Sequence, residues 1–540
     1  MRIPLAGPDI VVFVLYLLAV LAVGTWAARR GRETKRDYFL SGDKLPWWMI
    51  GGSIVASNIS SHHLVGVLGT AYKQGFVSVV IEWGAILVGF NALLWVFLPF
   101  YLRNGFYTMP EFLEKRYGTG ARTVYAVLVL LTYVFVEISA VLYLGGLALH
   151  SLLGIDIMLS IVVLAVATGA YTITGGLRAV IWTEMLQLVV LLAGGLALAF
   201  VTVRKVGGWP AVLETSARWH SFMPADDPEF PWTMYLGGVL CVSVFYCAAN
   251  QFIVQRTLAA KSEWHARMGV VFADYLKFLM PLVIVMPGLV APRLYPHLER
   301  PDLVFPTLVQ GLLAPGIAGL VMAALIAAVM SHVSGAVNSC TTIATIDLYL
   351  PFINPRAGET QAVRFGRMTG VVVVLVGILW ATMLIGRGDR PVFLYLLGAY
   401  GYFTPGITTM FLLGILWKRT THAGALAAGL LTIPLSVGLQ FAMPPAMERW
   451  FPHAWAAAGR YLTPQFNRAG IVFWTCMAVG AIVSLLTSPK PDAELTGLIW
   501  NRDSLALPTQ ERASHRGLRN PLIWWAIVTA LVLFFYVRYP

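Results

Sequence analysis

The chain has 540 residues, of which 58% are hydrophobic and only 12% are charged, with a formal net charge of +12. Soluble domains usually carry about 25% charged residues, so this composition argues against a soluble protein. The basic residues are spread over short loops rather than gathered on one soluble face, which argues against nucleic acid as a partner.

Repeated apolar runs of about 20 residues, each able to cross a bilayer core of about 30 Å, predict about fourteen membrane-spanning helices. In chain order they centre near residues 18, 58, 88, 136, 164, 192, 243, 280, 328, 376, 403, 430, 477 and 530. The long region 305–350 has room for a re-entrant or interfacial piece before its helix. We therefore expect an all-α integral membrane protein that lies in a lipid bilayer and has no large soluble domain.

The loop after the first span is strongly basic, with the sequence Arg-Arg-Gly-Arg-Glu-Thr-Lys-Arg at 29–36. Cytoplasmic loops carry an excess of Lys and Arg, so this loop should lie inside the cell. With about fourteen spans, both termini then lie outside. The first apolar segment is too long for a signal-peptide core and ends in basic residues rather than in a cleavage site. We expect a multi-pass protein of the plasma (inner) membrane.

A polar stretch interrupts the second span. Residues 56–66 read Ala-Ser-Asn-Ile-Ser-Ser-His-His-Leu-Val-Gly, within an apolar segment that runs from about residue 47 to 71. Unsatisfied polar groups in hydrocarbon cost several kcal/mol each, so such a break must be buried in protein or line a watery cavity. The break therefore predicts a binding site near the middle of the membrane. Adjacent helical side chains point about 100° apart, so His62 and His63 are poorly placed to share one metal ion.

Ionisable residues inside the spans narrow the possibilities. Glu82 lies in the third span and Lys277 in the eighth, where charges usually face the bundle interior. Lys277 has two interpretations. It forms a local ion pair with Asp274, one helical turn away, or it faces a polar cavity with Glu82, where carboxylate and ammonium together hold hydroxyl groups. Glu137 and Glu184 are also embedded or nearly so, and a structural or interfacial role is expected for each.

The seventh span contains a second interruption, which reads Ser-Val-Phe-Tyr-Cys-Ala-Ala-Asn-Gln at 243–251. It falls five spans after the first. Two broken helices at matching positions of two five-helix units indicate a transporter built from inverted repeats. Two unrelated polar patches are the alternative. The four cysteines lie within apolar spans without paired spacing, which is typical of reduced packing residues.

Several separate motifs, in order, are shared with a known family: Asp37-Tyr-Phe-Leu-Ser-Gly42, Ala56-Ser-Asn-Ile59, Glu82-Trp83, Tyr107-Thr-Met-Pro-Glu-Phe112, Tyr171-Thr-Ile-Thr-Gly-Gly176, Val254-Gln-Arg256 and Trp417-Lys-Arg419. From about residue 37 to 419 the chain resembles the solute:sodium symporter family, and most closely its sodium/glucose cotransporter branch. The resemblance implies a leucine-transporter-type core of two inverted five-helix repeats. It divides the chain into a first helix and basic loop (1–45), a first repeat (46–205), a second repeat with a broken first helix (206–420) and peripheral C-terminal helices (421–540).

The resemblance also implies a sugar site. Four residues of this chain stand at sugar-binding positions of the family: Asn58, His63, Glu82 and Lys277. Ser243 keeps a small polar group at another such position, and Tyr246 matches the aromatic gate that covers the sugar on its cytoplasmic side. Leu397 stands where the family has a glutamine, and Cys247 where several relatives have a tryptophan. A lost hydrogen-bonding group changes which ligand is accepted, so the sugar stays open.

The implied sodium ligands are the backbone carbonyls of three residues and one hydroxyl, from Ala56, Ile59, Ala328 and Ser331. His332 stands at the position of a second hydroxyl, and sodium is a hard cation that prefers oxygen ligands. Three outcomes stay open: sodium coupling with His332 turned away and Ser334 or water in its place, proton coupling through His332, or uncoupled transport. Together with Glu184, His332 marks a possible variant of the coupling machinery. His62 lies on the helix that faces His332, which suggests a link.

The sequence thus predicts a secondary active symporter that carries a sugar or similar polyol inward by alternating access, with sodium as the favoured coupling ion. We expect no organic cofactor and no enzymatic activity. The alternatives are a proton-coupled or uncoupled transporter of the same fold, a membrane sensor that does not transport, and a metalloenzyme that uses His62, His63 and His332. A carboxylate or amino-acid substrate would suit Lys277, but Glu82 beside it favours a neutral polyhydroxy ligand.

Overall fold

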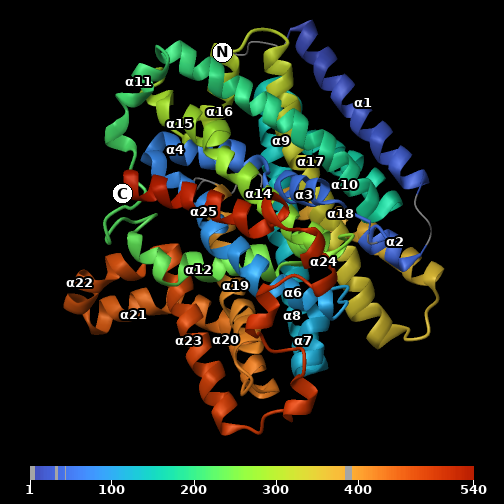
Figure 1. The fold of residues 1–540 in the computed structure, drawn as a ribbon. Coiled ribbons are helices and arrows are strands. Elements are labelled where there is room, and N and C mark those ends of the chain that lie inside the picture. Colours follow the sequence, from blue (N-terminus) through green and yellow to red (C-terminus); the bar gives the residue numbers. More distant parts are fainter. Residues whose placement is uncertain (1–5, 31–33, 43, 384–391) are drawn as a thin grey trace.

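The computed structural model describes residues 6–30, 34–42, 44–383 and 392–540, which form a bundle of helices (Figure 1). Among these residues, β-structure is limited to two isolated bridges. Twelve of the described helices are long and apolar enough to cross a membrane. The expectation of an all-α, multi-pass membrane protein is therefore confirmed, whereas the count of fourteen spans stays a prediction. Residues 31–33 of the basic loop lie outside the described part.

The helices fall along the chain as follows. The first half contains α1 (Gly7–Arg29), α2 (Lys35–Leu40), α3 (Trp47–Asn58), α4 (Leu68–Gln74), α5 (Val80–Gly84), α6 (Leu98–Arg103), α7 (Met109–Tyr117), α8 (Thr119–Thr132), α9 (Ser139–Leu153), α10 (Ile157–Val206), α11 (Trp209–Leu213), α12 (Gly238–Val244) and α13 (Gln251–Leu258). The second half contains α14 (Glu263–Met280), α15 (Met286–Val290), α16 (Val304–Leu312), α17 (Ile317–Ile343), α18 (Glu359–Met383), α19 (Val392–Leu416), α20 (His422–Val437), α21 (Met443–Trp450), α22 (Pro452–Leu462), α23 (Gln465–Leu486), α24 (Thr509–Ser514) and α25 (Pro521–Arg538).

The helix α10 is too long for a single crossing. Its 50 residues would extend about 75 Å if straight, whereas the bilayer core is about 30 Å thick. It bends at Gly176, where φ is +57°. A Cβ atom there would lie 2.4 Å from the carbonyl oxygen of Tyr38, so only glycine fits the bend. The predicted span centres near 164 and 192 lie on the two sides of this residue.

Both predicted helix interruptions are confirmed. The helix α3 ends at Asn58, Ile59 is extended with φ −83° and ψ 120°, and the helix resumes at His62. In the seventh predicted span, Asn250 is extended with φ −97° and ψ 119° between a π-helical turn and α13. The Asn250 side chain accepts a hydrogen bond from the Phe252 amide and so caps α13.

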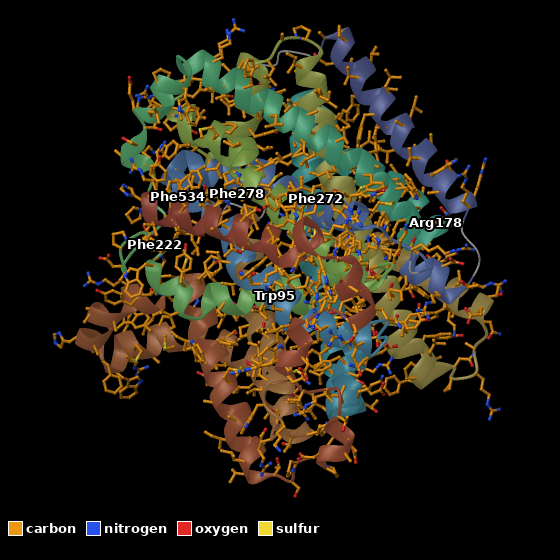
Figure 2. The ribbon with its side chains drawn as sticks, viewed as in Figure 1. Trp95, Arg178, Phe222, Phe272, Phe278 and Phe534 are labelled. Atoms are coloured by element: carbon orange, nitrogen blue, oxygen red, sulfur yellow. The ribbon has the colours of Figure 1, made fainter. Side chains whose placement is uncertain are left out.

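The centre of the bundle is formed by α3, α10, α14 and α17, which pack on one another in the pairs α3–α14, α3–α17 and α10–α17. The segment Ile317–Ile353 contains α17, and 89% of the residues in its most apolar stretch are buried. The corresponding share for α1, at the edge of the bundle, is 22% (Figure 1). On the outer helices large apolar side chains are exposed, such as Phe534 on α25 at 61% (Figure 2). Such a surface suits contact with lipid rather than with water. The first broken helix therefore lies at the protein-enclosed centre, as its polar residues require.

Candidate functional site

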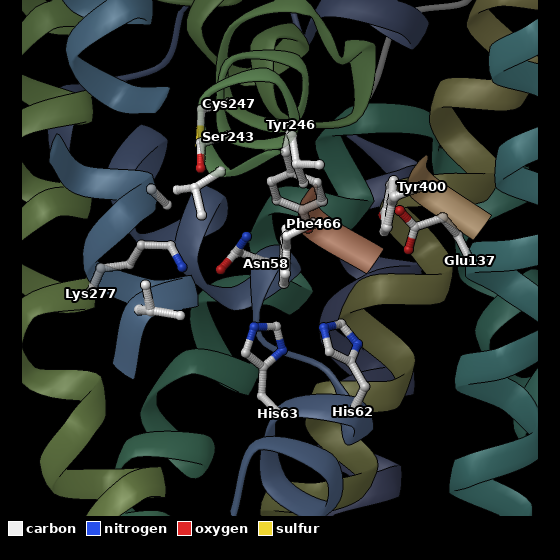
Figure 3. A pocket seen from close by; sticks show the side chains of 14 residues that line it. Asn58, His62, His63, Glu137, Ser243, Tyr246, Cys247, Lys277, Tyr400 and Phe466 are labelled. Atoms are coloured by element: carbon white, nitrogen blue, oxygen red, sulfur yellow. The ribbon is translucent and has the colours of Figure 1, made fainter. Parts of the chain in front are cut away.

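A cavity lies between the two interrupted helices (Figure 3). Its polar and aromatic lining consists of Asn58, His62, His63, Glu137, Ser243, Tyr246, Cys247, Lys277, Tyr400 and Phe466. Figure 3 shows Asn58, His63 and Lys277 directed into the same space from different helices. The structure therefore brings the predicted sugar-site residues of the two repeats together, whereas the side chain of Leu397 lies outside the described part of the chain.

One end of this cavity is built on a buried ion pair. Lys277 donates a hydrogen bond to Glu82, and both side chains are almost completely buried. The other carboxylate oxygen, Glu82 Oε1, lies 2.9 Å from His63 Nε2. The Ser60 amide donates to His63 Nδ1 (3.2 Å), so the proton of a neutral His63 lies on Nε2 and faces Glu82. Glu82 thus lies behind Lys277 and His63, and these two residues line the cavity.

This geometry decides between the two interpretations of Lys277. Its ammonium pairs with Glu82, which lies on a different helix. Asp274, on the same helix as Lys277, does not take this place: within the described residues its Oδ1 has no hydrogen-bond partner. The pair carries no net charge. A cavity with such a lining favours a neutral ligand that both donates and accepts hydrogen bonds.

The opposite wall of the cavity comes from α12 and the π turn after it, which supply Ser243, Tyr246 and Cys247. The Tyr246 ring lies 6.2 Å from that of Tyr400, at an angle of 81°. Within the described part, neither Tyr246 Oη nor Asn58 Oδ1 makes a hydrogen bond of normal geometry, although both atoms are buried. Buried polar atoms are almost always paired in proteins, so these two atoms favour a ligand rich in hydroxyl groups.

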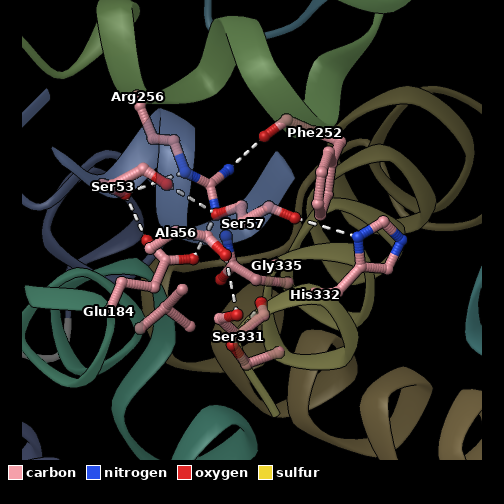
Figure 4. A network of polar contacts seen from close by, with 12 residues as sticks. Ser53, Ala56, Ser57, Glu184, Phe252, Arg256, Ser331, His332 and Gly335 are labelled. Atoms are coloured by element: carbon pink, nitrogen blue, oxygen red, sulfur yellow. Dashed lines mark hydrogen bonds and ion pairs between the residues drawn. The ribbon is translucent and has the colours of Figure 1, made fainter. Parts of the chain in front are cut away.

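Three of the four predicted ion ligands, from Ala56, Ala328 and Ser331, meet at the end of α3 (Figure 4). Ser331 Oγ lies 2.7 Å from the carbonyl oxygen of Ala56 and 3.1 Å from that of Ala328. The chain turns extended at Ile59, so α3 ends here with carbonyl groups that the helix does not use. Three oxygen atoms of the predicted set are therefore close together, at the partly negative end of a helix.

His332 points away from these oxygens. Its Nδ1 lies 2.9 Å from the carbonyl oxygen of Ser57 (Figure 4), and its Nε2 lies 2.6 Å from Glu137 Oε2. Ser334 does not take its place, because the Ser334 hydroxyl donates to the Ser331 carbonyl on its own helix (2.9 Å). The expected neighbourhood of His62 and His332 is confirmed, with ring centroids 5.9 Å apart.

Glu184 was expected to be embedded or nearly so, with a structural or interfacial role, and the structure places it deep inside the protein. Its side chain is fully buried and forms an ion pair with Arg256 at 2.6 Å (Figure 4). Ser53 and Ser57 on α3 donate hydrogen bonds to the same carboxylate. The reason is the bend at Gly176, which turns the second half of α10 back along α3. The buried position of Arg256 was missed, although its place just after an interrupted helix was a signal that could have found it.

The lining also includes residues that were not predicted as part of the site, among them Glu137, Tyr400 and Phe466. Phe466 belongs to α23, which was expected among the peripheral helices, and no sequence signal marks it. All four cysteines are buried and unpaired, as expected. The described residues contain no group of three or more His, Cys, Asp or Glu side chains placed to hold a metal ion.

Residues 38–432 match the model of the sodium:solute symporter family. The chain belongs to this family. A sodium/glucose cotransporter of Vibrio parahaemolyticus is 37% identical over 81% of this chain and 86% of the relative. Sodium/glucose cotransporter 1 of Oryctolagus cuniculus is 33% identical over 91% of this chain and 81% of its own length. Sodium/myo-inositol cotransporter 2 of Homo sapiens is 37% identical over 78% of this chain and 68% of its own length.

Solved structures agree on the fold of this symporter. A Na+-coupled sialic acid symporter in a substrate-bound outward-open state aligns with a TM-score of 0.76 at 23% identity, over 90% of this chain and 99% of the other. Mhp1, a nucleobase-cation-symport-1 family transporter, aligns with a TM-score of 0.53 at 15% identity, over 85% of this chain and 97% of the other. The expected leucine-transporter-type fold is thereby confirmed.

Proposed function

We propose that this protein is a secondary active transporter that carries a sugar or similar polyol into the cell together with sodium. The observation that carries the proposal is the neutral Lys277–Glu82 pair, with His63 and Asn58 beside it, in a cavity between two interrupted helices. The relatives named sodium/glucose and sodium/myo-inositol cotransporters support the same class of substrate.

In this proposal, the solute hydroxyl groups bind to four side chains that line the cavity, Asn58, His63, Ser243 and Lys277, and Glu82 contributes by holding the lysine and the histidine. The lysine donates hydrogen bonds, and the amide and the hydroxyl both donate and accept them. Tyr246 acts as the gate, and its ring offers an apolar face to a sugar or cyclitol ring. A carboxylate substrate fits less well, because Glu82 already neutralises Lys277.

Sodium would bind where α3 ends against α17, through the carbonyl oxygens of Ala56, Ile59 and Ala328 and the hydroxyl of Ser331. All four are hard oxygen ligands, and the end of α3 adds a partial negative charge. His332 bonds to Ser57 and Glu137 instead, so it neither completes this set nor blocks it. An ion at this junction would link the two repeats, and the affinities for ion and solute would then depend on each other by the same factor.

Alternating access would follow if the two repeats rock around the cavity at mid-membrane. We place the protein in the plasma (inner) membrane with both termini outside, because the basic loop at 29–36 favours the cytoplasm. The solute would then enter from the outer side and leave past Tyr246.

Uptake into proteoliposomes tests the proposal. Labelled glucose and labelled myo-inositol are each offered under an inward sodium gradient, an inward proton gradient and no gradient. We expect one of the two solutes to accumulate with sodium and neither to accumulate without a gradient. Accumulation under the proton gradient alone would overturn sodium as the coupling ion while leaving the solute class intact. No uptake of either solute under any condition would contradict the proposed solute class.

A further inference from the structure

A second cavity, of about 210 Å³, lies near the start of α14, the helix that also carries Lys277. The C-terminal segment before α25 folds against the start of α14 and encloses this space with Trp95. Its lining includes Arg267, Arg512, His515 and Asn520, with leucines between them, and contains no carboxylate among the described residues. Cationic and neutral donors without a carboxylate favour an anion.

Arg267 is the buried cation of this cavity, with an exposed fraction of 1%. Its Nη atoms donate to Glu263 (2.6 Å) and to the carbonyl oxygens of Ser504 (2.8 Å) and Leu505 (2.7 Å), which holds the C-terminal segment on α14. Its Nε has no hydrogen-bond partner in the described part of the chain. A buried guanidinium N–H without a partner costs free energy, so it points to a missing acceptor.

The carboxylates near this cavity are already engaged. Glu263 accepts hydrogen bonds from both Arg103 and Arg267, so one negative charge faces two positive ones. Glu511 accepts from the Ser262 hydroxyl and the Trp264 amide, at the start of α14. Arg512 itself forms no ion pair within the described part of the chain, and it lines the cavity, so its positive charge remains available to a ligand.

The first turn of α25 also opens on this cavity, since Asn520 and Pro521 line it. This helix has 18 residues, and its N-terminal end carries a partial positive charge, although Asn520 already caps the Leu522 amide. The unpartnered Nε–H of Arg267, the charge of Arg512 and the positive end of this helix together favour a phosphate group. We propose that this cavity is a binding site for a phosphate ester, held by Arg267 and Arg512 at the positive end of α25.

A phospholipid head group and a soluble phosphate share this chemistry. The rim of the cavity favours the lipid, because Leu505 and Leu522 are 42% and 48% exposed there and would contact acyl chains. The ring of Trp95 lies against Arg267, with its centroid 5.4 Å from the guanidinium carbon. In the topology proposed above the cavity faces the cytoplasm, where the anionic lipids of the inner leaflet are found.

Native mass spectrometry of the delipidated full-length protein tests this site with three ligands: dioleoylphosphatidylglycerol, dioleoylphosphatidylcholine and inorganic phosphate. We expect the wild type to retain one phosphatidylglycerol in preference to phosphatidylcholine. Arg512→Gln should lower this retention about fivefold, because one arginine near an anionic lipid contributes about 1 kcal/mol, which corresponds to that ratio. Arg512 is exposed, so the variant should fold normally.

The matched control is Arg516→Gln, which removes the same charge from the same segment outside the cavity and should retain phosphatidylglycerol like the wild type. Equal losses in the two variants would overturn the proposal, since the protein would then attract lipid by general charge. Equal retention of the two lipids by the wild type would overturn it too. Retention of phosphate but not of phosphatidylglycerol, again lowered by Arg512→Gln, would support the site and identify the source as soluble.

Discussion

At the scale of single residues, we expect the neutral pair of Lys277 and Glu82 to affect both stability and solute binding. Removal of one partner from a buried pair leaves the other charge uncompensated, at a cost of about 3–5 kcal/mol. We expect Glu82→Gln and Lys277→Gln each to lower the melting temperature and to abolish binding of the solute. The double variant should regain most of the stability, because two amides carry no charge, but none of the binding. Thermal unfolding with and without solute measures both effects.

Asp274→Asn is the matched control for this pair. It changes a buried carboxyl group on α14 one helical turn from Lys277, at a residue that does not line the cavity. We expect this variant to bind the solute like the wild type. Wild-type affinity in both single variants of the pair would instead show that the solute pocket is wrongly assigned.

His332 is the second residue whose role can be measured directly. His332→Ser places a hydroxyl beside Ser331, and an additional hard oxygen ligand should raise the apparent sodium affinity of uptake about tenfold, or about 1.4 kcal/mol. The sodium dependence of uptake in proteoliposomes gives this value. Ser334→Ala is the control, because the Ser334 hydroxyl donates to the Ser331 carbonyl on its own helix instead of joining the ion ligands. An unchanged sodium affinity in His332→Ser would place the ion elsewhere.

At the scale of elements, the bend of α10 at Gly176 positions Glu184 against α3. Alanine at this residue would adopt a positive φ and collide with the Tyr38 carbonyl oxygen, so we expect Gly176→Ala to cost about 2 kcal/mol or more. Gly438→Ala is the control, because Gly438 has helical dihedral angles and open space around its Cβ position. That variant should be neutral or slightly stabilising. Thermal unfolding of both proteins checks the difference, and equal melting temperatures would contradict it.

The elements also show what the sequence could predict. The breaks near residues 58 and 250 were predictable, because polar residues inside an apolar run have few stable environments. The depth of Glu184 was not, because the turn beside it looked like an interface when read locally. The cavity wall from Phe466 depends on how α23 packs against α12, and a contact between helices so distant in the chain leaves no local pattern.

At the scale of the whole molecule, the orientation in the membrane is open to a direct measurement. The basic loop at 29–36 favours an arrangement in which both termini are outside the cell. An epitope tag at the C-terminus should therefore bind antibody on intact spheroplasts, while a tag inserted at residue 490 should bind only after permeabilisation. Labelling of the C-terminal tag only after permeabilisation would reverse the topology and would also move the proposed phosphate site to the outer face.

The absence of net charge on the Lys277–Glu82 pair has a consequence for energy conversion. If the solute and its binding groups are neutral, the only net charge that crosses the membrane in each cycle belongs to the ion. One elementary charge moved through 100 mV releases about 2.3 kcal/mol, which alone would concentrate a neutral solute about fiftyfold. The slope of accumulation against membrane voltage would then count the ions moved per solute, so the stoichiometry of transport could be read from an electrical measurement.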